Sequence, residues 1–378
     1  MANTLKFGNG EWYGKKDTIL AYNDENSNFK PLAFNFERNT SATRVNKDGL
    51  IETVGSGEPR IDYKDDSKGA LLLEPSRSNA ITNSEAFDNA YWTKTNTTVT
   101  SGFLSPDGTN NAFKLISNNG GNIIARPSIS LNTNHATSIY LKRVSGNGNV
   151  SIFKTNGNEQ IITLTDEWQR FTDINSVNPS NAYMGVRLYG LNDEILIYGA
   201  QVEQGSYATS YIPTQGSAVT RSADSCDNGG NEQVINSSEG VLYAELSIDA
   251  NDGNFRFLSI SDGTNSNSVW IYYRSDTNQI NFRVIVGGVS SFDNIYTINN
   301  ATINHKLAIK YKTNDFSAWV NGVKVLTDNS GATFSSNVLN DLDFNRPDGI
   351  NNFYGNVKDV RVYNTALTDQ ELIALTTI

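Results

Sequence analysis

The sequence is poor in the residues on which much enzyme and metal chemistry depends. It has one cysteine, Cys226, and two histidines, His135 and His305. A single cysteine excludes an intrachain disulfide and a thiol-rich metal site. The histidines are far apart, and each lies just ahead of an expected strand, which favours polar strand-edge positions over a triad or a metal pair. We therefore expect no catalytic residue and no metal site.

Charge is also scarce, and its balance is acidic. Charged residues make up 19% of the chain and the formal net charge is -10, whereas an average chain has about a quarter of its residues charged. Asn, Ser, Thr and Gly fill the gap. This predicts a polar, uncharged surface suited to neutral ligands such as sugars, or simply a loop-rich β protein that needs turn residues. Because no basic patch is visible, we expect no nucleic-acid partner.

Long apolar runs are missing as well. No segment approaches the length needed to span a bilayer, so we expect no membrane insertion. The first residues, MANTLKFGNGEWYGKK, lack an apolar h-region, which predicts that there is no secretory signal peptide. If the protein acts outside a cell, it would leave by another route, such as cell lysis.

What the sequence does contain is a series of short alternating segments separated by turn residues, which predicts an all-β fold. We expect two tandem antiparallel β-sandwiches (jelly rolls) at 79–224 and 237–378, behind an extended N-terminal attachment and oligomerisation region. That region divides into an attachment segment, 1–35, and an arm with a hairpin, 36–78. Its aromatic residues are scattered and its aliphatic residues few, so we expect it to order by packing against another chain.

Local signals mark two hairpins and one short C-terminal helix. Asp48-Gly49 and Asn321-Gly322 are tight-turn pairs between expected strands. In ALTDQELIALTTI, Thr368 and Glu371 have the spacing of a capping box.

The stretch Gly69–Trp92 connects these regions. Its run Leu71–Leu73 predicts a buried strand, which the following proline ends. We expect Arg77 to tie the joint down by bonding carboxylate or carbonyl groups. The residues assigned a structural role in this joint are Glu74, Pro75, Arg77 and Asn79.

Aromatic side chains are the best candidates for ligand binding, because sugars stack their apolar faces on Trp and Tyr. In the segment VWIYYR, Trp270 and Tyr272 share one face of the strand, while Ile271 and Tyr273 share the other. The candidate glycan-binding residues are Tyr91, Trp92, Tyr183, Tyr189, Trp270, Tyr272 and Tyr273.

The acidic residues offer weaker candidates. Asp341 and Asp343 alternate on one strand, like glycosidase acids, but turn capping or solvent exposure explains them more simply. The Asp-Gly turns at Asp252 and Asp262 could supply oxygen ligands for Ca²⁺, although tight turns already account for them. We expect no cofactor, with calcium left open.

One resemblance covers about residues 36–224. The segment LLLEPSRSNAITNSEAFDNAYWTK and the later PDGT resemble a module common in tail-fibre and virion-surface proteins of bacteriophages. The resemblance implies a carbohydrate-binding-module-like jelly roll and a homotrimer. The matching residues are Glu74, Pro75, Arg77, Asn79, Ser84, Phe87, Trp92, Pro106, Asp107, Gly108 and Thr109.

A second resemblance covers residues 237–378, which are similar to concanavalin A-like lectin/glucanase (laminin-G-like) domains. The segments that show this resemblance are FSAWVNGVKV, FYGNVKDVRVYN and ALTDQEL. It implies the fold more than the activity, and the acidic motif of the glucanases is missing.

Together the resemblances imply a structural phage virion protein, a fibre or spike of tail or head, without enzyme activity. It would display lectin-like domains to host-surface glycans and contact other virion proteins through residues 1–70. It would be made in the host cytoplasm and end on the virion surface. The alternatives are a polysaccharide depolymerase of the tail, a ligand-free capsid or tail decoration protein, and a secreted bacterial adhesin, which the missing signal peptide opposes.

Overall fold

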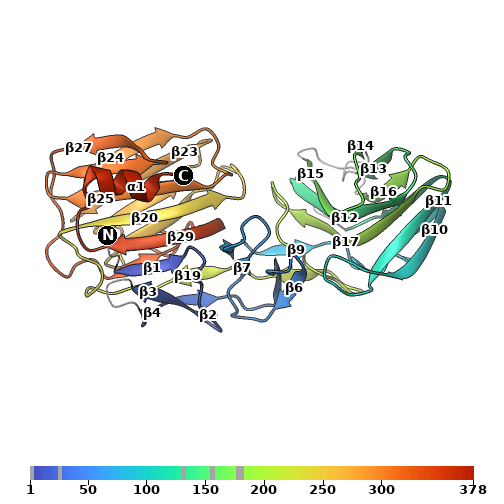
Figure 1. Cartoon of the computed structure of the whole chain (residues 1–378), viewed down its shortest axis with the longest axis horizontal. Coiled ribbons are helices and arrows are strands. Elements are labelled where there is room, and N and C mark those ends of the chain that lie inside the picture. The colour runs from blue at the N-terminus through green and yellow to red at the C-terminus, as the bar shows by residue number, and fades with distance from the viewer. Residues whose placement is uncertain (1–3, 24–27, 129–132, 154–157, 176–182) are drawn as a thin grey trace. The chain divides into compact units, whose positions relative to one another are not determined.

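The computed structural model describes residues 4–23, 28–128, 133–153, 158–175 and 183–378. The chain divides into two compact units. Unit 1 comprises residues 1–41, 54–75 and 223–378, and unit 2 comprises residues 42–53 and 76–222. The described residues are strands and loops apart from a short helix near the C-terminus (Figure 1), which confirms the all-β expectation.

Unit 1 contains a 12-stranded sheet with the order β19-β4-β3-β1-β29-β20-β25-β26-β27, in which β2 pairs with β3, and β8 pairs with β7 and β29. Its smaller sheet has the order β24-β23-β22-β21-β28. The strands of the larger sheet are β1 (Leu5–Gly8), β2 (Gly14–Lys15), β3 (Thr18–Asn23), β4 (Asn28–Glu37), β7 (Ile61–Asp62), β8 (Ala70–Leu73), β19 (Ser225–Asp227), β20 (Glu239–Ile248), β25 (His305–Lys312), β26 (Phe316–Val320), β27 (Val323–Asp328) and β29 (Gly355–Tyr363). Those of the smaller sheet are β21 (Arg256–Ser261), β22 (Ser268–Tyr273), β23 (Gln279–Val286), β24 (Val289–Thr297) and β28 (Asp341–Asp343).

The two faces of the larger sheet are covered by different elements, because side chains alternate along each strand. On β20, Leu242 and Ala244 belong to the core shared with the smaller sheet. Val241 and Tyr243 point the other way and pack with Leu372 of helix α1 (Asp369–Thr376). Unit 1 therefore has three layers: α1, the larger sheet and the smaller sheet.

Helix α1 starts where the sequence predicts. Thr368 accepts a hydrogen bond from the backbone N–H of Glu371, and the Glu371 side chain accepts one from the backbone N–H of Thr368. Such a box satisfies two of the N–H groups that a helix start leaves unpaired. The capping-box prediction is confirmed.

The N-terminal segment is built into unit 1. Strand β1 pairs with β29, with Leu5 opposite Val362 and Phe7 opposite Val360, and its other edge pairs with β3. Leu5 and Phe7 are buried in the unit 1 core. We expected this segment to need another chain, but its partner strand lies more than 340 residues further along its own chain.

The apolar run of the connecting stretch forms β8, and all four of its residues are buried. Leu71 and Leu73 lie opposite Val357 and Gly355 of β29, so β8 continues the edge along which β1 also pairs. The prediction of a buried strand is confirmed. The segment of unit 1 that contains it ends at Pro75, and unit 2 resumes at Ser76.

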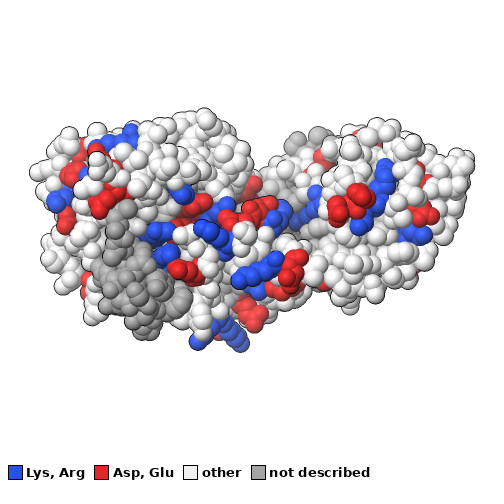
Figure 2. All heavy atoms as spheres, viewed as in Figure 1, with Lys and Arg blue, Asp and Glu red and all other residues white. Residues whose placement is uncertain are grey.

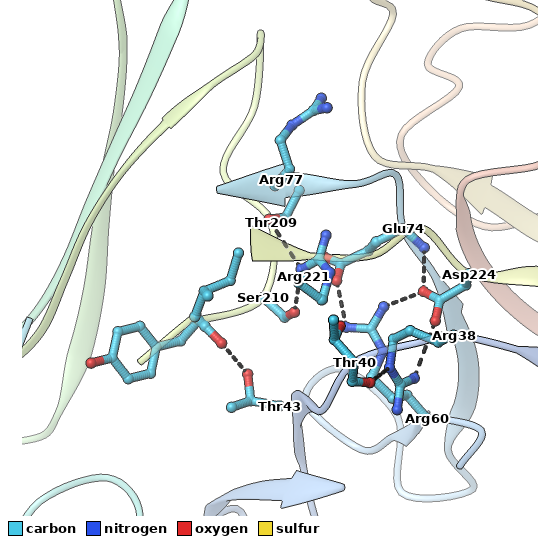
Figure 3. Close-up of polar contacts among 12 residues, drawn as sticks. Arg38, Thr40, Thr43, Arg60, Glu74, Arg77, Thr209, Ser210, Arg221 and Asp224 are labelled. Carbon is cyan, nitrogen blue, oxygen red and sulfur yellow. Dashed lines mark hydrogen bonds and ion pairs between the residues drawn. The ribbon is translucent and has the colours of Figure 1, made fainter. Parts of the chain in front are cut away.

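A buried ion-pair network joins three chain segments within unit 1 (Figure 3). Arg60 pairs with Glu74, at 2.5 Å, and with Asp224, which also pairs with Arg38 at 3.2 Å. These four side chains are at most 4% exposed. Burial alone would lower the pKa of Arg60, but the Asp224 and Glu74 carboxylates outweigh burial and raise it. Two guanidinium groups thus balance two carboxylates away from water.

Unit 2 is built on an eight-stranded antiparallel sheet with the order β14-β13-β16-β11-β17-β12-β15, in which β10 pairs with β11. The side chains that face inward form its core, including Leu115, Ile139 and Ile197. Two small sheets, β5-β6 and β18-β9, complete it. The strands are β5 (Ala42–Val45), β6 (Ile51–Val54), β9 (Arg77–Asn79), β10 (Thr93–Phe103), β11 (Ala112–Ala125), β12 (His135–Ser145), β13 (Val150–Phe153), β14 (Glu159–Ile162), β15 (Gln169–Asn175), β16 (Met184–Leu188), β17 (Glu194–Gln204) and β18 (Val219–Arg221).

Both predicted hairpins are present. Asp48-Gly49 lies between β5 and β6, and Gly49 has a φ of 77°. Asn321 and Gly322, with φ of 49° and 82°, join β26 to β27. Positive φ at both central residues fits the twist of a tight hairpin, which is why Asn-Gly is favoured there.

The rare residues lie inside the fold rather than on its surface. Cys226 is buried, and burial raises the pKa of its thiol. His135 and His305 are the first residues of β12 and β25, as expected, but they are only 2% and 4% exposed and so lie inside the fold. Burial lowers the pKa of both imidazoles.

The surface matches the low charge content of the sequence. On the face drawn in Figure 2, acidic and basic side chains are interspersed and most of the surface is uncharged.

Candidate binding face

The smaller sheet of unit 1 has one face in the core and one face turned away from it. Ile271 and Tyr273 of β22 belong to the unit 1 core. Trp270 and Tyr272 belong to a separate cluster with Phe257 of β21. The predicted division of the VWIYYR segment into two faces is therefore confirmed. Tyr273, 1% exposed, lies on the core face and is corrected from a binding to a core residue.

Three rings lie in contact on the outward face, which we call the aromatic face. Phe257 and Tyr272 are stacked, with centroids 4.3 Å apart and planes at 8°. Trp270 meets Phe257 edge-on at 5.4 Å. Trp270 is only 5% and Tyr272 only 6% exposed. We expected open stacking platforms, but the two rings instead form part of a tightly packed surface.

Polar side chains from β23 and β24 border the rings. In the sheet register, Asn281 lies opposite Tyr272 and Arg283 opposite Trp270. The Arg283 guanidinium lies 5.4 Å from the centroid of the Trp270 ring and 3.1 Å from Asp293 of β24. The Asn281 amide donates to Asp293 at 3.1 Å. Asp293 therefore holds a cation and an amide side by side above the rings.

Two polar atoms of this face have unused hydrogen-bonding capacity. The indole Nε1–H of Trp270 and the Oδ1 of Asn281 are buried and have no hydrogen-bond partner among the described residues. One is a donor and the other an acceptor, and they project from adjacent strands on the same side of the sheet. Leaving such groups unpaired in a protein interior costs about 1–3 kcal/mol each. A hydroxyl group, which donates and accepts, could satisfy either.

The acidic pair lies at the edge of this sheet. In the register of β28, Asp343 lies opposite Ser259 and Asp341 opposite Ser261. Burial and the neighbouring Asp341 raise the pKa of Asp343 to about 7, and burial and Asp227 raise that of Asp341. The backbone N–H of Asn228 donates to Asp343 at 2.8 Å.

The spacing of these two carboxyl groups does not suit glycoside hydrolysis. They lie within hydrogen-bonding reach of one another. Glycosidase carboxyl groups need about 5 Å or more between them to flank a bond. The Asn228 contact agrees with a turn-capping role for Asp343, whereas its 5% exposure rules out the solvent-exposed alternative.

The predicted aromatic residues of unit 2 are placed differently from one another. Trp92 is 1% exposed in the core, with its indole N–H donating to the Asn83 carbonyl at 2.9 Å, so it is corrected to a core residue. Tyr91 is half-buried beside it. Tyr183 is half-buried, with the Arg126 guanidinium 4.4 Å from its ring centroid. Tyr189 is 46% exposed and donates to Glu159 at 2.9 Å, so its ring is accessible to a ligand.

The joint residues are used structurally. Glu74 belongs to the buried network of unit 1. In unit 2, Arg77 lies 3.9 Å from Glu203 and donates to the Ser76 carbonyl at 3.1 Å. Asn79 is fully buried and fills its hydrogen-bonding capacity with four backbone groups. Its side chain thereby fixes β9 against β17.

The turns considered for calcium use their carboxylates internally. Asp252 pairs with Arg256 at 2.8 Å, and Asp262 accepts from Thr264 and Asn267. In the part of the chain that the structure describes, no group of three or more His, Cys, Asp or Glu side chains could hold a metal ion. No helix within those same residues is long and apolar enough to cross a membrane.

Sequence reasoning missed the polar half of the aromatic face. Phe257, Asn281, Arg283 and Asp293 were not singled out, because their relation to Trp270 depends on which strands pair and in what register. The one available signal was alternation: NFRFLS and INFRVIV place aromatic and polar residues at every second position.

Comparison with known proteins agrees with the fold of unit 1. Residues 227–373 match the family model described as the concanavalin A-like lectin/glucanases superfamily. This part of the chain is similar to that superfamily, as its sequence resemblance predicted. No curated protein sequence matches the chain.

Parts of several solved structures are also similar to this chain. The CBM40 of the Ruminococcus gnavus IT-sialidase is 18% identical, with 39% of this chain and 92% of that chain covered and a TM-score of 0.33. Domain 4 of a GH43 extracellular arabinanase from Geobacillus stearothermophilus, in complex with arabinotriose, is 14% identical over 41% and 73%, with a TM-score of 0.32. The Bacillus licheniformis β-glucanase is 16% identical over 38% and 72%, with a TM-score of 0.30.

Proposed function

We propose that this chain is a non-catalytic glycan-binding protein and that the aromatic face of unit 1 contacts the sugar. The observation that carries the proposal is the unused donor of Trp270 beside the unused acceptor of Asn281, within the lectin/glucanase-like domain. Sugar hydroxyl groups would fill both once the side chains above them move aside, because both atoms are buried in this structure. Arg283 and Asp293, whose side chains are 31% and 39% exposed, would meet the ligand first.

The wider role that we propose is adhesion. The resemblance of residues 36–224 to phage tail-fibre and virion-surface modules supports a fibre or spike of tail or head that binds host-surface glycans. A homotrimer would repeat a weak site on one particle and raise avidity without any new contact.

Binding is tested with the full chain on a glycan array, followed by titration of the strongest ligand. Replacing Trp270 with Phe removes the indole N–H and keeps an aromatic ring. Losing one hydrogen bond of ordinary strength should weaken binding about fivefold. The matched control is Trp319→Phe, because the Trp319 indole lies against α1 and donates to Ser317 at 3.0 Å.

Binding that is equal in both variants would place the ligand elsewhere, and an array that binds nothing would favour a ligand-free decoration protein. New reducing ends from host polysaccharide incubated with the protein would favour the depolymerase. Immunogold electron micrographs of particles, together with the mass of the protein in solution, test the virion location and the homotrimer.

A further inference from the structure

Unit 2 contains a pocket of about 510 Å³ whose lining includes none of the predicted aromatic residues. Pockets of about 300–1,000 Å³ are the size that holds small ligands. We call it the Glu85 pocket. Its lining residues are Asn83, Glu85, Ala86, Ser101, Asn111, Phe113, Thr214, Gln215 and Gly216.

Two chain segments far apart in sequence are hydrogen-bonded to one another and form one side of the pocket. The backbone N–H of Ser84 donates to the Thr214 hydroxyl at 3.0 Å, and the backbone N–H of Thr214 donates to the Ser84 hydroxyl at 2.8 Å. Asn83 and Gln215 form an isolated β-bridge beside them. This reciprocal bonding fixes the positions from which Glu85 and Gln215 line the pocket.

Glu85 is held in place by two buried tyrosines. The hydroxyls of Tyr211 and Tyr198 donate to its Oε1 at 2.9 Å and 3.2 Å. Burial raises the pKa of Glu85, the two tyrosine bonds oppose that shift, and the nearby charge of Asp107 adds to it. No described donor contacts the other oxygen, Oε2, which is left to accept a bond from a ligand.

A second unfilled acceptor lies in the same pocket. The Asn111 amide donates to Asp107 at 2.9 Å, which turns its Oδ1 away from that carboxylate. This Oδ1 is buried and has no hydrogen-bond partner among the described residues. Phe113 lies two residues along from Asn111 and opposite Ser101 of β10, so an apolar ring borders the polar groups.

The lining decides which ligands fit. It contains amides, a hydroxyl, a carboxylate and a phenyl ring, and it contains no Lys or Arg. With Asp107 close behind Glu85, an anionic ligand would be repelled. Acceptors near an aromatic ring suit a compact ring that is apolar on its face and carries hydroxyl donors at its edge.

We propose that the Glu85 pocket binds a single neutral sugar residue, with its hydroxyl groups donating to Glu85 Oε2 and Asn111 Oδ1 and its ring lying against Phe113. This site is separate from the aromatic face and does not depend on it. If both exist, each chain has two glycan contacts.

The test uses the full chain and four neutral probes: methyl α-D-glucopyranoside, methyl β-D-galactopyranoside, methyl α-D-mannopyranoside and N-acetylglucosamine. Binding is measured by saturation-transfer NMR at sugar concentrations up to about 10 mM. This is well above a Kd of ~1 mM, which is expected for a single sugar residue. N-acetylneuraminic acid is the anionic comparison.

Three variants locate the site. Ser101→Trp places a large ring in the pocket from a position whose side chain forms no hydrogen bond with any described residue, and it should weaken binding at least about tenfold. Thr100→Trp is the matched control, because Thr100 is exposed on the other side of the same strand. Glu85→Gln keeps an acceptor for the tyrosines, removes the charge, and should weaken binding about threefold to tenfold.

The expected result is that at least one neutral sugar binds, that Ser101→Trp and Glu85→Gln lose it, and that Thr100→Trp retains it. The proposal is overturned if none of the four sugars binds or if Ser101→Trp binds as well as the unmodified protein. Failure here is distinct from failure at the aromatic face. Binding that is lost in Trp270→Phe and kept in Ser101→Trp would refute sugar binding at the Glu85 pocket and would support binding at the aromatic face.

Discussion

Replacing Asp224 with Asn should destabilise unit 1 severely. The Asp224 carboxylate is fully buried, pairs with Arg60 and Arg38, and accepts from the backbone N–H of Glu74 at 2.8 Å. The substitution leaves two guanidinium groups facing one carboxylate, and it turns an amide donor toward cations. Breaking a buried ion pair by removing one partner costs about 3–5 kcal/mol. A domain has about 5–15 kcal/mol of stability in total, so the change should remove a large part of it.

The measurement is hydrogen–deuterium exchange of the full chain in increasing urea, read by mass spectrometry from peptides of β1, β8 and β29. These peptides report unit 1, so the free energy of unfolding is obtained without assuming that the whole chain unfolds in one step. The matched control is Asp276→Asn, because Asp276 pairs with Arg274 at 3.3 Å and its side chain is 58% exposed. Exposed pairs contribute about 1 kcal/mol or less.

A loss of less than about 1 kcal/mol in Asp224→Asn, equal to that of the control, would refute the reasoning. It would mean that the site relaxes or admits water readily enough to hold an unbalanced guanidinium. The variant Asp224→Ala removes the carboxylate without adding an amide donor. It therefore separates the effect of the lost carboxylate from the effect of the new donor.

Two further effects on stability are expected. The folded-state pKa of Asp343 is raised from its ordinary 3.8 to about 7. The stability that protonated Asp343 contributes to the fold is therefore present below pH 4 and is lost as pH rises through 7. Asp343→Asn should therefore flatten the fall in melting temperature of the native chain between pH 4 and 8, where up to about 4 kcal/mol is at stake; an unchanged slope would contradict the assignment. Leu372→Ala should cost about 2–5 kcal/mol, because Leu372 is fully buried on the face of α1 that packs against the larger sheet. The exposed Ile373→Ala should cost far less, and equal losses in calorimetry would show that α1 does not pack as described.

Local features of the fold could be predicted because their causes lie within a few residues. The capping box of Thr368, the Asn321-Gly322 turn and the buried run Leu71–Leu73 each depend on near neighbours. The place of β1 could not be predicted in the same way. Its partner β29 is at the other end of the chain, and no local pattern records that pairing.

The candidate site shows the same limit. Alternation correctly separated Trp270 from Tyr273, because the two faces of a strand follow from the period of two. It could not show that Phe257 stacks on Tyr272 and so reduces the exposure of that ring. Trp92 lies in a turn without periodicity, and its burial depends on Phe87 and Phe113, which the fold brings together.

The pairing of β1 with β29 has a consequence for synthesis. Unit 2 is complete once residue 222 has been made, whereas the larger sheet of unit 1 needs β29, which ends at Tyr363. During translation, β1 and β8 therefore remain unpaired with β29 while unit 2 folds. Pairing between distant segments is slow, and unpaired strands left waiting are prone to aggregate. A fragment that begins at residue 237 would expose the edge of β29 for the same reason, so studies of the lectin-like domain should retain residues 1–75.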